Sequence, residues 1–155
     1  MNQPAAALAP IHKSITVAAS PERAFAFYTA NMSEWWPLAS HSVGEAEAVS
    51  VVCGAAVGEQ IVETTADGSV HIWGTITLWD PPHRVAHTWH AGAPLEEATD
   101  IVVSFTPDGE GRTRVELTHS GWERRSGDPA RMRSGYEGGW DKVLGAYAAT
   151  LRAGS

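Results

Sequence analysis

PARMRSGYEGGWDKVLGAYAATLR, residues 129–152, is the stretch of sequence that decides the fold we expect for this chain. Its apolar side chains recur every three or four residues, so they share one face of an α-helix. The helix would extend for about 36 Å at ~1.5 Å per residue, which makes it longer than an average helix. A β-sheet could therefore wrap around it. The apolar face consists of Met132, Tyr136, Trp140, Val143, Leu144, Tyr147 and Leu151.

Two glycines, Gly138 and Gly139, lie in the middle of this predicted helix. Each weakens the helix by ~1 kcal/mol relative to alanine. One explanation is a local kink in the helix. The other is a close approach of the helix backbone to another segment or to a ligand, and the sequence leaves both explanations open.

Upstream of the helix, residues 45–122 show the period of β-strands, in which apolar and polar residues alternate. Turn sequences such as Asp67-Gly68 and Pro107-Asp108-Gly109 separate the strands. Consecutive strands joined by short turns form an antiparallel meander. We place the strands near residues 46–53, 57–65, 70–79, 84–90, 98–106 and 112–120.

The N-terminal part of the chain adds one strand and one helix to this meander. Residues 1–10 are rich in Ala and Pro and predict a flexible arm, and residues 11–18 alternate as a strand does. Ser20-Pro21-Glu22 predicts a helix start, because Ser caps, Pro suits the first helical position and an acid suits the first turn. The sheet needs a cover for its apolar face, and only the C-terminal helix is large enough. We therefore expect one α+β domain over residues 11–155, in which a curved antiparallel sheet wraps around the C-terminal helix.

Composition limits the classes of protein to which the chain can belong. It has 155 residues and a formal net charge of −7, without a run of Lys and Arg, so we expect no nucleic-acid partner. The single cysteine, Cys53, excludes an internal disulfide and a multi-cysteine metal site. The N terminus lacks the features of a signal peptide, and no window approaches the ~18–20 apolar residues that span a bilayer. We expect a cytoplasmic protein that is a monomer or a weak homodimer.

Strand alternation also predicts which side chains face the interior of the sheet. The inward set is apolar except for His87 and His119, each of which is either a hydrogen-bonded core residue or a group that orients a ligand. In the strand 70–79, Trp73 and Trp79 share one parity, and the even-numbered residues 74, 76 and 78 share the other. The sequence leaves open which of the two sets faces inward.

Seven tryptophans are the unusual feature of the composition. Trp is large enough to line a cavity as well as to fill a core. Aromatic side chains around a few convergent polar groups are typical of a small-molecule pocket, and ordinary core packing is the alternative. The candidate ligand-binding residues are Trp35, Trp36, His87, Trp89, Phe105, His119, Tyr136 and Trp140.

Catalytic and metal-binding signatures are absent from the sequence. It contains no G-x-S-x-G, H-E-x-x-H, P-loop or G-x-G-x-x-G motif. His87 and His90 would point to opposite faces of one strand, so we expect no metal site and no cofactor there. We assign no catalytic residue, and the remaining enzymatic hypothesis is acid–base catalysis by His87, His119 or Tyr136 on a polyketide-like substrate.

Several motifs occur in a recognisable order along the chain: SPERAF (20–25), WDPPHRV (79–85) with Thr88-Trp89, Val103 to Pro107, LTHSGW (117–122) and Gly139-Trp140 with Leu144. Together they resemble the SRPBCC (START-like) superfamily, in the branch named for activator of heat-shock protein 90 ATPase homologues. The resemblance covers about residues 11–152 and implies a helix-grip fold with a cavity between the sheet and the C-terminal helix. Across the superfamily such cavities hold lipids, sterols, polyketides and hormones. His87 departs from the pattern, because such sequences often have Phe or Tyr at its position.

Three functional hypotheses follow from the residues and the resemblance. The leading one is a non-catalytic protein that binds an apolar or aromatic small molecule, such as a lipid or a polyketide, in the cavity. The second is an enzyme of cyclase, aromatase or hydrolase type that uses the pocket histidines. The third is a protein-interaction or co-chaperone-like module.

Overall fold

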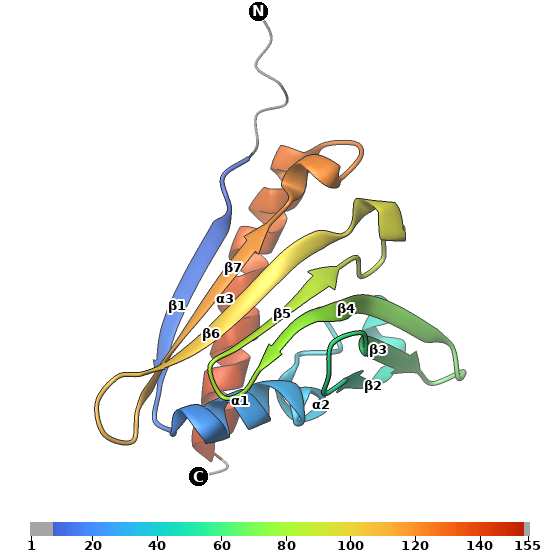
Figure 1. Ribbon diagram of the computed structural model, residues 1–155. Coiled ribbons are helices and arrows are strands. Elements are labelled where there is room, and N and C mark those ends of the chain that lie inside the picture. Colours follow the sequence, from blue (N-terminus) through green and yellow to red (C-terminus); the bar gives the residue numbers. More distant parts are fainter. Residues whose placement is uncertain (1–7, 154–155) are drawn as a thin grey trace, which may run out of the picture.

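A single curved sheet around one long helix forms the protein (Figure 1), and the computed structural model describes residues 8–153. The helices are α1 (Pro21–Thr29), α2 (Met32–Trp35) and α3 (Pro129–Ala153), with short 3-10 turns at Glu45–Glu47, Leu95–Glu97 and Trp122–Arg124. The strands are β1 (Ile11–Val17), β2 (Ala48–Cys53), β3 (Gln60–Thr65), β4 (Val70–Asp80), β5 (Arg84–Trp89), β6 (Thr99–Pro107) and β7 (Thr113–Ser120). The predicted flexible arm falls mostly on residues 1–7, which lie outside the described residues.

All strands are antiparallel, in the order β1-β7-β6-β5-β4-β3-β2. β2 to β7 form the predicted meander, and β1 joins it at β7, so that β1 and β2 are the two edges. The segment of α1 and α2 carries the chain from one edge to the other, and α3 lies across the concave side (Figure 1). The predicted helix-grip fold is confirmed. Two strands begin two to three residues later than we expected, because a 3-10 turn precedes β2 and a longer turn precedes β3.

Two β-bulges in β4 explain why simple alternation could not assign its inward face. Trp73 is the extra residue opposite β3, and Thr77 is the extra residue opposite β5. Each bulge shifts the alternation by one position. As a result Trp73 and Trp79 both turn toward the interior, and Ile76 from the other parity set does so as well, at intervals of three residues.

The first bulge is tight because β4 approaches β5 closely at Gly74. A Cβ atom added at Gly74 would lie 1.8 Å from the carbonyl oxygen of Thr88. The hydroxyl of Thr88 in turn accepts a hydrogen bond of 2.9 Å from the backbone N–H of Thr75. Only glycine fits between the two strands here.

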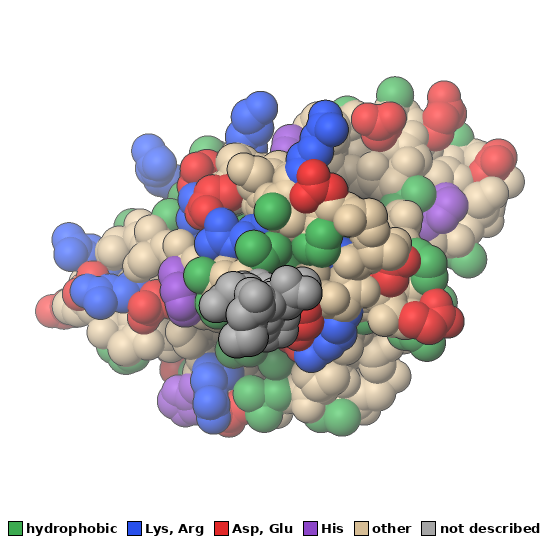
Figure 2. All heavy atoms as spheres, turned by 90° about the horizontal axis from the view of Figure 1, so that it is seen from above, with side chains coloured by type: hydrophobic (Ala, Val, Ile, Leu, Met, Phe, Trp, Pro, Cys, Tyr) green, Lys and Arg blue, Asp and Glu red, His purple; other side chains and the backbone are tan. Residues whose placement is uncertain are grey.

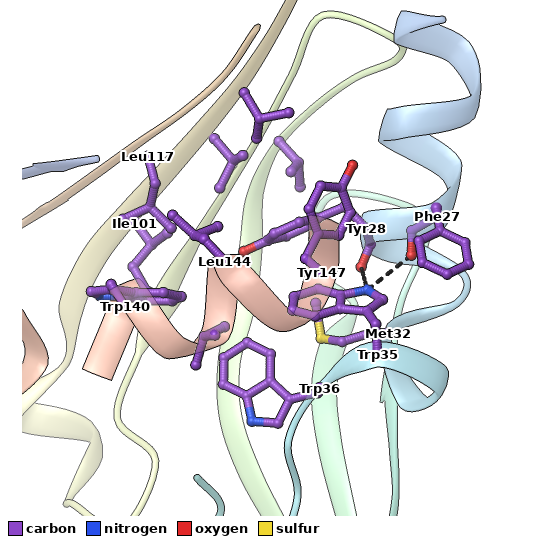
Figure 3. Packing of buried hydrophobic residues seen from close by; sticks show 14 of the residues in the cluster. Phe27, Tyr28, Met32, Trp35, Trp36, Ile101, Leu117, Trp140, Leu144 and Tyr147 are labelled. Carbon is purple, nitrogen blue, oxygen red and sulfur yellow. Dashed lines mark hydrogen bonds between the residues drawn. The ribbon is translucent and has the colours of Figure 1, made fainter. Parts of the chain in front are cut away.

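The core behind the sheet is largely aromatic at the end where α1 packs. The Phe25 ring of α1 meets the Phe105 ring of β6 edge-on, with a centroid distance of 5.3 Å. Tyr28 and Trp35 pack against Tyr147 of α3, and the indole N–H of Trp35 donates to backbone carbonyls of α1 (Figure 3). The predicted start of α1 is confirmed by the Ser20 hydroxyl, which accepts from a backbone N–H of the first turn. Aromatic side chains therefore fill this end of the interior.

Helix α3 runs without interruption through Gly138 and Gly139. The helix therefore does not end or restart at these glycines. The second half of the helix is the buried half, from Trp140 to Leu151, whereas Met132 and Tyr136 in the first half are half-buried. The incomplete burial of the first half marks the place where the interior opens.

Candidate ligand-binding cleft

A cleft of about 580 Å³ opens along the first half of α3. Its walls are α3 between Arg131 and Val143, the loop that follows α2, and the end of β5 with the turn after it. This volume lies within the range of ~300–1,000 Å³ that is typical of small-molecule sites. The cleft is therefore large enough for a molecule of several fused rings.

Three tryptophans from three different elements meet in the lining of the cleft. Trp36 follows α2, Trp89 ends β5 and Trp140 lies on α3. Their ring centroids are 5.7, 5.9 and 6.0 Å apart, so they form one contiguous aromatic surface. All three are at least nine-tenths buried, because they also pack against the core. They give the cleft a rigid apolar lining.

A buried hydrogen-bond chain through His119 links the indole of Trp140 to the backbone of Trp89. The Trp140 N–H donates to Nδ1 of His119 at 3.0 Å, which places the imidazole proton on Nε2. That Nε2–H donates to the Thr99 hydroxyl at 2.7 Å, and the hydroxyl donates to the backbone carbonyl of Trp89 at 3.1 Å. Burial lowers the pKa of His119 to about 3, so the ring is neutral at physiological pH. His119 thereby joins the helix side of the lining to the sheet side.

His87 is the second predicted pocket histidine, and it lies in the core rather than in the cleft lining. Its Nδ1–H donates to the carbonyl of Thr88 at 2.8 Å. Within residues 8–153 its buried Nε2 has no hydrogen-bond partner. Burial lowers the pKa of His87 to about 4. It is therefore a neutral imidazole at physiological pH.

Four of the eight predicted site residues line the cleft and four do not. Trp35 and Phe105 belong to the aromatic core beneath α1, and His87 and His119 lie behind the lining. Strand parity identifies side chains that face the interior, but it cannot tell which part of the interior α1 fills and which part stays open. The four residues in the lining are Trp36, Trp89, Tyr136 and Trp140.

Buried Glu63 on β3 fixes the loop that forms one wall of the cleft. Its carboxylate accepts backbone N–H groups of Val43 at 2.9 Å and Gly44 at 2.7 Å, and the indole N–H of Trp73 at 2.8 Å. Three donors on one carboxylate offset the cost of its burial. The loop is thus tied to the sheet at two consecutive residues, and its wall of the cleft is preorganised.

His41 in this loop is a cleft residue that the sequence analysis missed. Its carbonyl accepts the indole N–H of Trp36 at 2.7 Å, and its Nδ1 lies 2.7 Å from the Ser40 hydroxyl. Burial, and then the charge of Lys142, lower its pKa, so the ring is neutral at pH 7. A loop histidine has no periodicity that could predict its position. The only hint in the sequence that His41 lies in the cleft is that it follows Trp36, a predicted site residue, by five positions.

Two glycines one helical turn apart, Gly135 and Gly139, line the cleft on α3. A Cβ added at Gly135 would meet no atom within 4 Å. One added at Gly139 would meet only the His41 ring, at 3.9–4.0 Å. These positions therefore keep the cleft wide at the expense of helix propensity. Gly138 lies outside the lining, so only one glycine of the central pair contributes to it.

Charged side chains occur at the mouth of the cleft but do not form a patch of one sign. Arg131 lines the mouth and is exposed. On another side of α3, Lys13 pairs with Glu137 at 3.2 Å and with Asp141 at 2.9 Å. The end of the molecule at which α3 begins shows basic and acidic side chains interspersed with hydrophobic ones (Figure 2).

Two other kinds of site are not found within residues 8–153. No three His, Cys, Asp or Glu side chains gather there where they could hold a metal ion. No helix in that range is long and apolar enough to cross a membrane.

The profile of one protein family matches residues 18–152, and that family is described as activator of Hsp90 ATPase homolog 1-like protein. The chain belongs to this family. The resemblance inferred from the motifs is thereby confirmed, over nearly the same span. No curated protein matches this Hsp90-activator-homolog-like chain.

Among solved structures, this member of the family is similar to an anthrahydroquino-γ-pyrone synthase, Txn09, in a complex with a compound designated SUM. The two chains are 32% identical over 93% of this chain and 97% of the synthase, with a TM-score of 0.67. Protein MLL2253 from Mesorhizobium loti is 17% identical over 94% and 98%, with a TM-score of 0.70. The Aha1 dimer from Colwellia psychrerythraea is 22% identical over 93% and 96%, with a TM-score of 0.65. The last two share the fold.

Proposed function

We propose that this protein binds a flat, polycyclic aromatic molecule of the polyketide type in the cleft between α3 and the sheet. The observation that carries the proposal is the contiguous surface of Trp36, Trp89 and Trp140, which faces a cleft of about 580 Å³. Aromatic rings bind other rings by offset or edge-on stacking, worth ~0.5–1.5 kcal/mol per pair beyond the burial of apolar area. A planar molecule uses such a surface better than a flexible chain does.

The rest of the cleft supports a rigid ligand rather than a flexible one. Gly135 and Gly139 contribute no side chain to the α3 wall of the cleft, so a flat ring system has room beside the helix backbone at these two positions. The opposite loop is held by Glu63, so binding requires little ordering of the protein. The 32% identical relative is a synthase of an anthrahydroquino-γ-pyrone, a polycyclic aromatic compound, which agrees with a ligand of this shape.

The proposal is tested by measuring binding with defined probes. Native mass spectrometry of the full chain with 9,10-anthraquinone, flavone or palmitate should show one bound molecule for the ring compounds and little for the fatty acid. Tryptophan emission should change on binding of the ring compounds, because the three indoles would contact them. Failure of every planar aromatic probe to bind, or a preference for palmitate, would refute the proposal.

Catalysis of ring closure is a second candidate function, and the similarity to the γ-pyrone synthase over nearly the whole of both chains favours it. A pyrone ring contains an oxygen atom, so its formation requires an oxygen–carbon bond. In an addition reaction, a phenol oxygen bonds to the β-carbon of a conjugated alkynyl ketone, the phenol proton moves to the α-carbon, and the triple bond becomes the ring double bond of the pyrone. Neutral His41 in the cleft is the group that could accept that proton.

The two functions are separated by following the product. A phenol that carries a conjugated alkynyl ketone in reach of its oxygen should isomerise, with unchanged mass and a new retention time in liquid chromatography. His41→Ala should abolish this isomerisation while the dissociation constant of the same compound stays within about twofold. If the native protein binds the compound but forms no product, the catalytic function is excluded and the binding function remains.

A further inference from the structure

The hydrogen-bond donors on the tryptophan wall of the cleft are engaged within the protein, whereas the Arg131 guanidinium lies exposed at the mouth. The indole N–H groups of Trp36, Trp89 and Trp140 donate to the His41 carbonyl, the Tyr136 hydroxyl oxygen and the His119 ring, at 2.7, 2.9 and 3.0 Å. The hydroxyl of Ser42, another lining residue, donates to a backbone carbonyl. Because these donors already have acceptors within the protein, the three indoles offer a ligand mainly apolar surface.

The Tyr136 hydroxyl is different, because only its oxygen is engaged. The oxygen accepts the Trp89 N–H, and within residues 8–153 no acceptor lies within hydrogen-bond distance of the hydroxyl hydrogen. A phenol hydroxyl donates once and also accepts. The indole that donates to it directs the O–H away from itself, and the Tyr136 side chain is part of the cleft lining. The Tyr136 O–H is thus a half-buried donor on the cleft wall, and none of residues 8–153 is recorded as accepting from it.

We propose that Tyr136 selects ligands that carry a ring carbonyl oxygen, by donating its hydroxyl proton to that oxygen. The inference rests on the proposed function, since it names the class of planar aromatic molecule that the cleft prefers: quinones and fused aromatic ketones over the corresponding hydrocarbons. Tyr136 lies on α3 between Gly135 and Gly139, so the carbonyl would lie against the open stretch of the helix. Trp89 acts as the residue that orients the hydroxyl.

The test compares two probes of the same shape, 9,10-anthraquinone and anthracene, by quenching of tryptophan emission in the full chain. The native protein should bind the quinone about five- to tenfold more tightly, the equivalent of roughly one net hydrogen bond. Tyr136→Phe should bring the ratio of the two dissociation constants close to one, mainly by weakening the quinone. Tyr147→Phe is the matched control, because the Tyr147 hydroxyl donates to the Ala24 carbonyl in the core, outside the cleft. It should leave the ratio unchanged.

The outcomes separate this inference from the proposed function. Equal binding of both probes by the native protein overturns the role of Tyr136 and leaves aromatic binding standing. A Tyr136→Phe variant that keeps the full preference for the quinone also overturns it. If neither probe binds to the native protein, the proposed function itself fails. Near-ultraviolet circular dichroism of each variant verifies that the indoles keep their environment, so a change in the ratio is attributable to the hydroxyl.

Discussion

Substitution of His87 by phenylalanine should make the protein less sensitive to acid. Burial lowers the pKa of His87 to about 4 and that of His119 to about 3, against about 6.5 in an unfolded chain. Between these values the unfolded state binds a proton that the folded state does not, so stability falls as the pH falls. Each histidine contributes a slope of about 1.4 kcal/mol per pH unit once the pH lies well below 6.5. The two together contribute about 2.7 kcal/mol per unit, and His87→Phe should remove half of this.

The assay is urea unfolding followed by tryptophan emission, at several pH values between about 5.5 and 4.5, where both folded histidines stay mostly neutral. Carboxylates also titrate there, but they are common to both proteins, so the difference between the two slopes isolates His87. At neutral pH the variant should lie within about 1 kcal/mol of the native protein, because the change removes the unpartnered Nε2 but also the hydrogen bond from Nδ1–H to the Thr88 carbonyl. Identical slopes for the two proteins would refute the assignment of His87 as a buried neutral imidazole.

Three other substitutions test how the fold positions the cleft, with the free energy of unfolding as the measurement. Gly74→Ala should cost about 3 kcal/mol or more, because the new Cβ would collide with the Thr88 carbonyl; a cost below ~1 kcal/mol would contradict that close approach. Glu63→Ala should cost about 3 kcal/mol or more by leaving three N–H groups unpaired, and should also weaken ligand binding by releasing the loop; unchanged stability would exclude this anchor. Ser20→Ala should cost only about 1 kcal/mol as the loss of a helix cap, and a much larger loss would point to a role beyond capping.

The elements of the fold could be predicted because each has a local period. The recurrence from Met132 to Leu151 predicted α3, and alternation predicted the strands that surround it. The inward face of β4 could not be predicted, because the bulges at Trp73 and Thr77 depend on how the neighbouring strands pair. Bulges of this kind break a period without leaving a signal in the strand's own sequence, apart from Gly74, which the close contact with β5 requires.

The cleft was predicted only in part, because only the residues on regular helices and strands follow a period. Trp89 and Trp140 were accessible to prediction because each lies on a regular element that faces the interior. His41 was not, because its position depends on a loop held by distant Glu63, and Gly135 gave no signal among the other glycines of the helix. Side chains that face the interior are readable from the sequence, whereas the space that they leave open depends on the packing of all elements together.

If a planar aromatic molecule binds in the cleft beside α3, a side chain that fills the cleft should prevent this binding, and one pair of leucine variants examines this. Gly135→Leu places a four-carbon side chain in the cleft, and Gly138→Leu places the same side chain on the same helix outside the lining. Both changes should strengthen the helix by up to about 1 kcal/mol, so neither should unfold the protein. The measurement is the dissociation constant of 9,10-anthraquinone for each variant by fluorescence titration. Gly135→Leu should bind the quinone at least about tenfold more weakly, which corresponds to about 1.4 kcal/mol, whereas Gly138→Leu should keep the native affinity. Equal affinity of the two variants would contradict binding in this cleft.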